Sequence, residues 1–372
     1  MSNTRVTQHP PTKPHAAHPE WRVNKELFPT EGPVDDQLAF LVQYAILAPS
    51  VHNAQPWIFE VRGDTISLFA DRSRRLPVID PHDRELIIGC GSALYALRLA
   101  MRKFEMVDVV GLLPDKKNPD LLATVTIGGG AGEKHKPSDD DVVLFRQIPN
   151  RRSSRMPFDR TVIPDGIVSK CARDAEAEGA MIYPVADRHT RHLIATLVAE
   201  GDREQMHSQA FREELARWLR PNQGCHKDGI PSYAEGHTSK VWDFLSKIEP
   251  LIVRRFDIGK GVAAHDQELA EGSPLITVLC TKGDTPLDWL RAGQAAMRVS
   301  LRAQAGEVCS SYLNQPVEVA HLRPRLQKVL GATEIPQLVL RMGHGPDVEP
   351  TPRRPVGEVV RKVEGVFGRR VA

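Results

Sequence analysis

A run of basic and hydroxyl side chains lies near the middle of this 372-residue sequence. Residues 149–159 read PNRRSSRMPFD, which brings Arg151, Arg152, Ser153 and Arg155 close together. Guanidinium groups bind phosphate oxygens in pairs, and hydroxyl and backbone N–H groups add further donors. The cluster therefore predicts an anion site. A solvated basic turn and an RNA-binding patch are the alternatives.

A second polar segment follows the first predicted helix. Residues 48–57 read APSVHNAQPW, in which Pro49 ends the helix and short polar side chains follow. Such a loop offers backbone amides and small side chains to a ligand. The alternative is an ordinary helix-terminating loop whose Trp57 packs inward at the start of a strand. For His52, a surface or capping role is favoured over that of a catalytic acid.

Other motifs in the sequence are weak. Residues 128–140, GGGAGEKHKPSDD, contain G-x-G-x-G after a predicted strand, but no helix start and no GK[ST] follow, so we interpret them as a linker. Neither GxSxG nor HExxH occurs. The five cysteines show no CxxC spacing, which favours reduced thiols and no zinc site.

Hydrophobic periodicity places these segments among helices and strands. A long polar helical region covers about 190–258. The other expected helices are 35–48, 80–104, 140–148, one from about 164, 285–307 and one near 317–331. The expected strands are a hairpin over 57–71, then 107–114, 121–127, 181–186, 274–282 and 336–343.

The two halves of the chain share a weak internal similarity. GSALYALRLA (91–100) aligns with GQAAMRVSLR (293–302), each in a long helix rich in small residues. The order of elements around the two helices is also similar. We interpret this pattern as a degenerate internal duplication.

Three segments of the chain resemble the nitroreductase family of FMN enzymes. APSVHNAQPW resembles the APSxxNxQPW signature after that family's first core helix. RRSSRMPFD (151–159), with VIP after it, resembles its N-terminal segment, and PQLVLRMGHGPDVEPTPRRP (336–355) is similar to its closing strand and arginine tail. DRSRRLPVIDPHDREL (71–86) also resembles the fused, mycobacterial Acg group of that family.

The resemblance implies an FMN site and assigns its residues. Catalysis would occur at flavin N5, so no catalytic side chain is expected. The turn after the second long helix would present a backbone N–H to N5. The implied phosphate ligands are Arg151, Arg152, Ser153, Arg155, Arg353 and its neighbour Arg354; Pro49, Ser50, Val51 and Asn53 would face the ring and ribityl chain; and Ser311, Tyr312 and Leu313 match the N5 turn.

The order of the motifs is inverted relative to an ordinary subunit of the family, in which the arginine cluster precedes the APS loop. The resemblance therefore implies an α+β fold of two fused nitroreductase-like halves, each a mostly antiparallel sheet packed with helices. The long central helices would lie between the halves and one complete flavin site would remain. The expected divisions are a disordered tail (1–30), a first half (31–127), a linker (128–140) and a second half (141–372) with a lid-like insertion at about 203–264.

Two functions remain open at this point. The first is an FMN-dependent oxidoreductase that passes electrons from NAD(P)H to a nitro compound, quinone or similar small-molecule acceptor. The second is a non-catalytic protein that stores or sequesters FMN beneath the lid. A third class, an interaction protein without a cofactor, is less favoured.

Composition excludes several other classes. The net charge of +2 argues against a nucleic-acid or anionic lipid partner. No apolar run reaches the ~20 residues that a membrane helix needs. The N-terminus has no apolar signal-peptide core. We therefore expect a cytoplasmic protein. The fused halves that the resemblance implies lead us to expect a monomer with an internal pseudo-dimer, or a dimer that forms outside the flavin interface.

Overall fold

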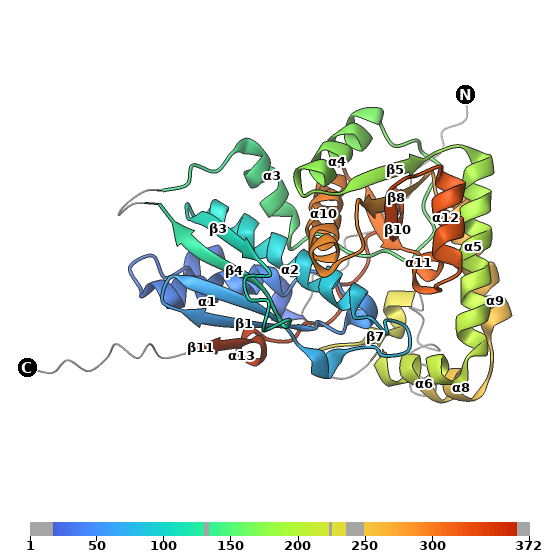
Figure 1. Cartoon of the computed structure of the whole chain (residues 1–372), viewed down its shortest axis with the longest axis horizontal. Helices are drawn as coiled ribbons and strands as arrows, with labels where there is room; N and C mark the ends of the chain where they lie inside the picture. Colours follow the sequence, from blue (N-terminus) through green and yellow to red (C-terminus); the bar gives the residue numbers. More distant parts are fainter. Residues whose placement is uncertain (1–17, 130–133, 223–224, 236–248, 363–372) are drawn as a thin grey trace, which may run out of the picture.

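Two β-sheets lie on either side of a pair of long central helices (Figure 1). This computed structural model describes residues 18–129, 134–222, 225–235 and 249–362. The first sheet has the strand order β11-β1-β2-β4-β3, and the second has the order β5-β8-β10-β9. The strands are β1 (Trp57–Arg62), β2 (Thr65–Ala70), β3 (Val107–Leu112), β4 (Leu121–Gly128), β5 (Met181–Val185), β8 (Leu275–Thr281), β9 (Cys309–Tyr312), β10 (Ile335–Gly343) and β11 (Val360–Lys362), with β6 (Leu219–Arg220) and β7 (Ile230–Pro231) forming a separate pair.

Helices surround both sheets. Within the sheets every strand pair is antiparallel except β1–β11, so the predicted α+β class with mostly antiparallel pairing is confirmed. The helices are α1 (Val34–Ala45), α2 (Arg84–Lys103), α3 (Asp139–Gln147), α4 (Asp165–Ala177), α5 (Arg188–His207), α6 (Gln209–Trp218), α8 (Glu249–Arg255), α9 (Gly259–Gly272), α10 (Pro286–Ala305), α11 (Gln315–Glu318), α12 (Leu322–Leu330) and α13 (Val356–Val359). Short 3-10 turns are η1 (Pro19–Trp21), η2 (Lys25–Leu27), η3 (Val51–Asn53), η4 (Arg72–Arg74) and η5 (Ser232–Glu235).

The central helices α2 and α10 touch at a pair of glycines. A Cβ on Gly91 would lie 2.2 Å from the carbonyl oxygen of Leu290, and a Cβ on Gly293 would lie 2.0 Å from that of Ile88. The two contacts are reciprocal, because each glycine meets the carbonyl three positions before the other. The absence of a side chain at both positions allows this close approach. The expected packing of the two long helices against each other is therefore confirmed.

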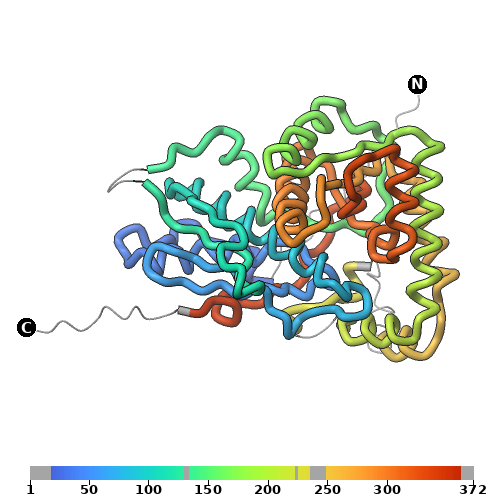
Figure 2. Tube along the Cα trace, in the orientation of Figure 1, coloured from blue at the N-terminus to red at the C-terminus, as the bar shows by residue number. Residues whose placement is uncertain are grey.

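The C-terminal tail crosses from the second sheet to the first. After β10, the chain runs through α13 to β11, which pairs in parallel with β1 at Phe59 and Val360. Figure 2 shows this last described segment beside the N-terminal half of the chain. Val359 is fully buried in the core of the first sheet. The tail thus brings the arginines before it back to the loop that follows α1.

The prediction of a disordered tail over residues 1–30 is wrong for residues 18–30; residues 1–17 lie outside the described residues. Residues 18–30 contain η1 and η2, and Trp21 is only 4% exposed. The physical reason is the indole, whose N–H donates to the carbonyl of Thr351 at 2.8 Å. The low apolar content of the segment hid this one anchoring residue.

The segment that we expected to be an insertion, about 203–264, begins inside α5 and ends inside α9. Its described part packs beside the end of α5 through Met206, Phe211 and Val253, with Leu76 and Ile79 from the first half. The carboxylate of Glu214 accepts from the backbone N–H groups of Val78 and Ile79. The insertion therefore contacts both halves of the molecule.

Candidate functional site

The loop between α1 and β1 has an unusual backbone. His52, Asn53 and Gln55 all have positive φ, at 49°, 52° and 53°, although none is glycine. Such conformations cost free energy and persist only where neighbouring contacts hold them. One such contact is the hydroxyl of Ser50, which accepts from the N–H of Gln55 at 2.8 Å. As predicted, Trp57 is fully buried at the start of β1.

The side chain of Asn53 joins this loop to two distant segments. Its amide nitrogen donates to the carbonyls of Gly229 in the insertion (3.1 Å) and Pro352 in the tail (3.0 Å). Its oxygen accepts from Arg353 at 2.9 Å. Gln55 repeats the pattern, since its amide donates to Lys227 O at 2.8 Å. The loop, the insertion and the tail therefore form one connected unit.

Arginines from two distant parts of the chain converge beside the end of α1. Arg151 and Arg353 both donate to the carbonyl of Leu47 at 3.3 Å, and Arg353 also donates to Ala48 O. Both arginines are 3% exposed, and the Nε atom of each has no hydrogen-bond partner. Arg152 donates to the carbonyls of Pro149 and Arg151. We call Arg151, Arg152 and Arg353 the arginine cluster.

The arginine cluster is an uncompensated positive site. Burial lowers the pKa of all three side chains, and Arg151 lowers the pKa of Arg152 further, to about 9. Repulsion from Arg151 and Arg152 adds to the effect of burial on the pKa of Arg353. Within the described part of the chain, no ion pair joins these three guanidinium groups to a carboxylate. Buried charges without a partner are costly, so the cluster is arranged to receive an anion.

The remaining predicted phosphate ligands lie in different surroundings. Ser153 is exposed, and its hydroxyl accepts from Arg151 at 3.4 Å. Arg155 is also exposed, and its charge acts on His52, Asp202 and Arg341.

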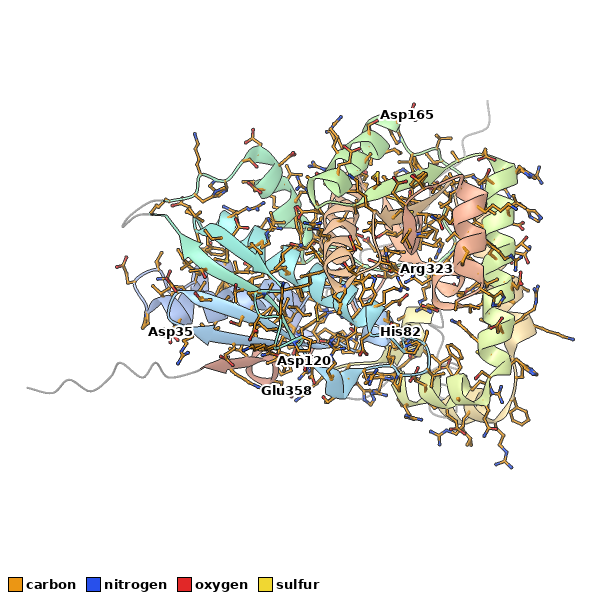
Figure 3. The ribbon with its side chains drawn as sticks, viewed as in Figure 1. Asp35, His82, Asp120, Asp165, Arg323 and Glu358 are labelled. Carbon is orange, nitrogen blue, oxygen red and sulfur yellow. The ribbon has the colours of Figure 1, made fainter. Side chains whose placement is uncertain are left out.

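Arg354 lies apart from the cluster, next to the neighbouring loop. It donates to the carbonyl of Gln55 at 3.1 Å and pairs with Asp71 at 3.4 Å. Arg354 also donates to the backbone carbonyl of Glu358 at 3.2 Å, a residue labelled in Figure 3. Of the two tail arginines, Arg353 is therefore the one beside Arg151.

Strand β9 carries the predicted N5 turn. The N–H of Leu313 donates to Val339 O at 2.9 Å, so this amide belongs to the sheet. Asn314 has φ −84°, so no left-handed backbone is required here. Tyr312 interacts electrostatically with Arg151. Ser311 is buried and pairs with Arg341 on β10.

A set of acidic side chains near this turn was missed by the sequence analysis. Burial raises the pKa of Glu85 and of Asp202 to about 7, and that of Glu318 well above its ordinary value. Asp202 Oδ2 and Glu85 Oε2 have no hydrogen-bond partner. These carboxyls come from α2, α5 and α11, and carboxylates dispersed among helices leave no local motif that could have identified them.

A small recess lies between the loop after α1 and the N-terminus of α2. Val51, Ala54 and Pro56 from the loop and Glu85 and Leu86 from α2 line it, together with Arg74, Leu76 and Asp80. In the same loop, burial lowers the pKa of His52 to about 3, and the charge of Arg155 adds to that effect. In the described residues no cluster of side chains could hold a metal ion.

No protein-family model matches the chain. Among curated proteins, the "Putative NAD(P)H nitroreductase Rv3131" of Mycobacterium tuberculosis is 30% identical over 349 residues, covering 92% of this chain and 96% of its own length. The "Putative NAD(P)H nitroreductase acg" of the same species is 27% identical over 332 residues, covering 87% of this chain and 95% of its own length.

Similar solved structures include an FMN-dependent nitroreductase, NfnB, from Mycobacterium smegmatis in complex with NADPH. It has a TM-score of 0.40 and 16% identity, and the match covers 60% of this chain and 99% of that one. The NfnB of a Sphigopyxis strain gives a TM-score of 0.38 and 18% identity, with 60% and 98% covered. The assignment of the chain rests on its sequence relatives.

Proposed function

The chain belongs to the NAD(P)H nitroreductase family of the Acg type, and from this premise we propose that it is an FMN-dependent oxidoreductase. Its electron donor would be NAD(P)H, and its acceptor a nitro compound, a quinone or a similar small molecule. One flavin would bind per chain. The proposal concerns the recess between the loop after α1 and the N-terminus of α2, together with the arginine cluster.

The observation that carries the proposal is the arginine cluster. Three guanidinium groups from residues 151–152 and 353 lie together without a paired carboxylate among the described residues. The Nε–H groups of Arg151 and Arg353 are buried donors that still lack an acceptor. A phosphate monoester supplies both the negative charge and the acceptor oxygens that the cluster lacks. The residues present therefore fit the phosphate of FMN.

Other parts of the chain would border the rest of the cofactor. Bound FMN would supply hydride transfer at its N5 atom. The loop around Pro49, Ser50 and Val51 would border one side of the flavin, with β9 and Tyr312 on another. Asn53 would act by holding Arg353 in position, because its amide already contacts Arg353, Gly229 and Pro352. Glu85, whose pKa is raised to about 7 by burial, would hold a proton near this recess at neutral pH.

The second candidate function is storage or sequestration of FMN without turnover. The observation that favours it is the attachment of the insertion to the loop after α1. Lys227 and Gly229 accept from Gln55 and Asn53, and Asp228 forms ion pairs with Arg74 and Arg220. A segment held in this way could cover the flavin and exclude a nicotinamide ring.

A spectroscopic experiment separates the two functions. The purified protein should show flavin absorption bands, and acid release should identify FMN. Bleaching of those bands by NADPH or NADH under anaerobic conditions, followed by recovery with a nitroaromatic or quinone, would support the oxidoreductase. Stable bands in the presence of both donors would support storage. A protein that neither carries nor binds FMN would refute both.

A further inference from the structure

Trp21 lies directly against the arginine cluster. The guanidinium carbon of Arg152 is 4.0 Å from the centroid of the indole ring, and that of Arg353 is 4.6 Å from it. The two arginines are 201 positions apart in the sequence, yet both lie over the same ring. Trp21 comes from a third segment, the 3-10 turn near the start of the described chain.

The indole is fixed by its own hydrogen bond. Its N–H donates to Thr351 O at 2.8 Å, and the hydroxyl of Thr351 accepts from Arg353 at 2.6 Å. Nearby, the hydroxyl of Tyr233 donates to Pro350 O and contacts the ring nitrogen of His18 at 3.0 Å. The segment around Trp21 is thereby tied to residues 350–353 of the tail. The ring cannot move without moving the backbone that carries Arg353.

The indole ring also reduces the electrostatic repulsion within the arginine cluster. Three like charges repel one another when buried together, and no ion pair with a carboxylate among the described residues offsets that repulsion. The face of an indole carries partial negative charge and attracts a guanidinium group, most strongly where water is excluded. A neutral ring achieves this without competing for the anion, whereas a carboxylate in the same place would repel it.

We propose that Trp21 is a positioning residue of the phosphate site: it holds Arg152 and Arg353 in place before the anion arrives. This inference rests on the proposed function, because it takes the arginine cluster to bind the phosphate of FMN. Trp21 acts on the phosphate through the two arginines and needs no contact with the flavin ring. Its effect should therefore depend on whether the ligand carries a phosphate.

That dependence gives the test. The dissociation constants of FMN and riboflavin, which lacks the phosphate, are measured for the apoprotein and for Trp21→Leu. FMN should bind about tenfold more weakly to the variant, from the loss of a desolvated cation–π contact, while riboflavin binding stays within about twofold. Trp289→Phe, on α10 and outside the cluster, is the control and should change neither constant. An unchanged FMN affinity, or an equal loss for both ligands, would overturn the proposal.

A second substitution avoids the risk that the leucine variant does not fold. Site-specific replacement of Trp21 by 5-fluorotryptophan withdraws charge from the ring face and keeps its shape. The ratio of riboflavin to FMN dissociation constants should then fall by about twofold, because only the cation–π contact is weakened. An unchanged ratio would refute the role of the ring.

Arg353→Ala separates this inference from the proposed function. If FMN and riboflavin bind this variant as they bind the natural chain, the phosphate assignment itself is wrong. If Arg353→Ala loses FMN selectively and the Trp21 variants do not, the phosphate assignment stands and the role of Trp21 fails.

Discussion

At the scale of single residues, the site is defined by charges that have no partner. Arg151 and Arg353 share one backbone acceptor, Leu47 O, at the end of α1. Carbonyls at a helix C-terminus carry partial negative charge and attract cations. This attraction explains why Arg151 and Arg353 both lie beside Leu47 O. A single carbonyl, however, does not neutralise two guanidinium groups. The positive charge that remains on the two guanidinium groups can attract an anionic ligand.

The first prediction concerns Arg151. Arg151→Ala should weaken FMN binding by roughly ten- to a hundredfold, since it removes a charge-assisted contact worth about 1.5–3 kcal/mol. Arg62→Ala, exposed at the end of β1, is the control. Arg74 would not serve as a control, because it pairs with Asp228 and donates to Ala54 O. Titration of the apoprotein with FMN measures the effect, and equal losses for Arg62 and Arg151 would contradict it.

The second prediction concerns the pH dependence of stability. Burial raises the pKa of Glu85 to about 7, whereas the unfolded value is about 4.3. At pH values between about 4.3 and 7, Glu85 holds a proton in the folded chain and releases it in the unfolded chain. The free energy of unfolding therefore falls as the pH rises through this range.

Glu85→Gln should remove this dependence and keep the acceptor used by Arg84. The loss of unfolding free energy between pH 5 and pH 8 should become smaller by about 2–3 kcal/mol, measured by urea unfolding. Glu176→Gln, exposed on α4, should leave the loss unchanged. A variant with the same pH dependence as the natural chain would show that Glu85 is ionised in the folded protein.

At the scale of elements, the contact between α2 and α10 depends on two glycines. A Cβ at Gly91 would come within 2.2 Å of Leu290 O, which is backbone and cannot rotate away. The third prediction is that Gly91→Ala lowers the free energy of unfolding by about 3 kcal/mol or more, because the helices must separate. Gly261→Ala, in α9 with open space around it, should be neutral or slightly stabilising. Urea unfolding of both variants decides the matter, and similar effects would argue against close packing at Gly91.

Elements with regular hydrophobic spacing could be predicted from the sequence. The hairpin at Gly63, both central helices and strands β8 and β10 lie where the pattern places them. The interactions that were missed are long-range. Trp21 anchors to Thr351, and Asn53 to Gly229, and neither contact has a local signal. The acids Glu85, Asp202 and Glu318 also come together only in the folded chain.

The sequence identified the segments that carry the candidate site, but it could not show which of their side chains lie next to each other. Arg151, Arg152 and Arg353 lie together, and their role as phosphate ligands stays a prediction, whereas Arg354 contacts Gln55 and Asp71. Two adjacent arginines on an extended tail point in different directions, and the sequence cannot say which one faces the site. An aromatic residue in a polar N-terminal segment was the available signal for Trp21.

At the scale of the whole molecule, the reciprocal glycine contact has the form of an interface between two copies of one subunit. In an isologous interface, residue i of one copy meets j of the other, and j meets i. Gly91 and Gly293, which align in the sequence, meet each other's preceding turn in this way. The internal duplication and the monomeric state remain predictions that this geometry favours.

In the described residues no helix is long and apolar enough to cross a membrane.

The two halves differ where a second flavin site would lie. The first half connects α1 to β1 through residues 46–56, whereas the second connects α4 to β5 through residues 178–180 alone. The short connection leaves no counterpart of the APS loop. In its place, Glu178 pairs with Arg98 at 3.0 Å and with Arg298 at 2.8 Å. Arg98 and Arg298 are each paired with two acids, so neither has an unsatisfied charge to offer a phosphate.

The fourth prediction is therefore one FMN per chain. The arginine cluster and the loop around Asn53 lie together, whereas the short connection after α4 carries Glu178, which is paired with Arg98 and Arg298. The flavin-to-protein ratio after saturation with FMN and acid release should be close to one. Arg353→Ala should lower the fraction bound at limiting FMN, and Arg298→Ala should not. A ratio near two would mean that the second half also holds a flavin, and the assignment of the Glu178 ion pairs as its replacement would then be wrong.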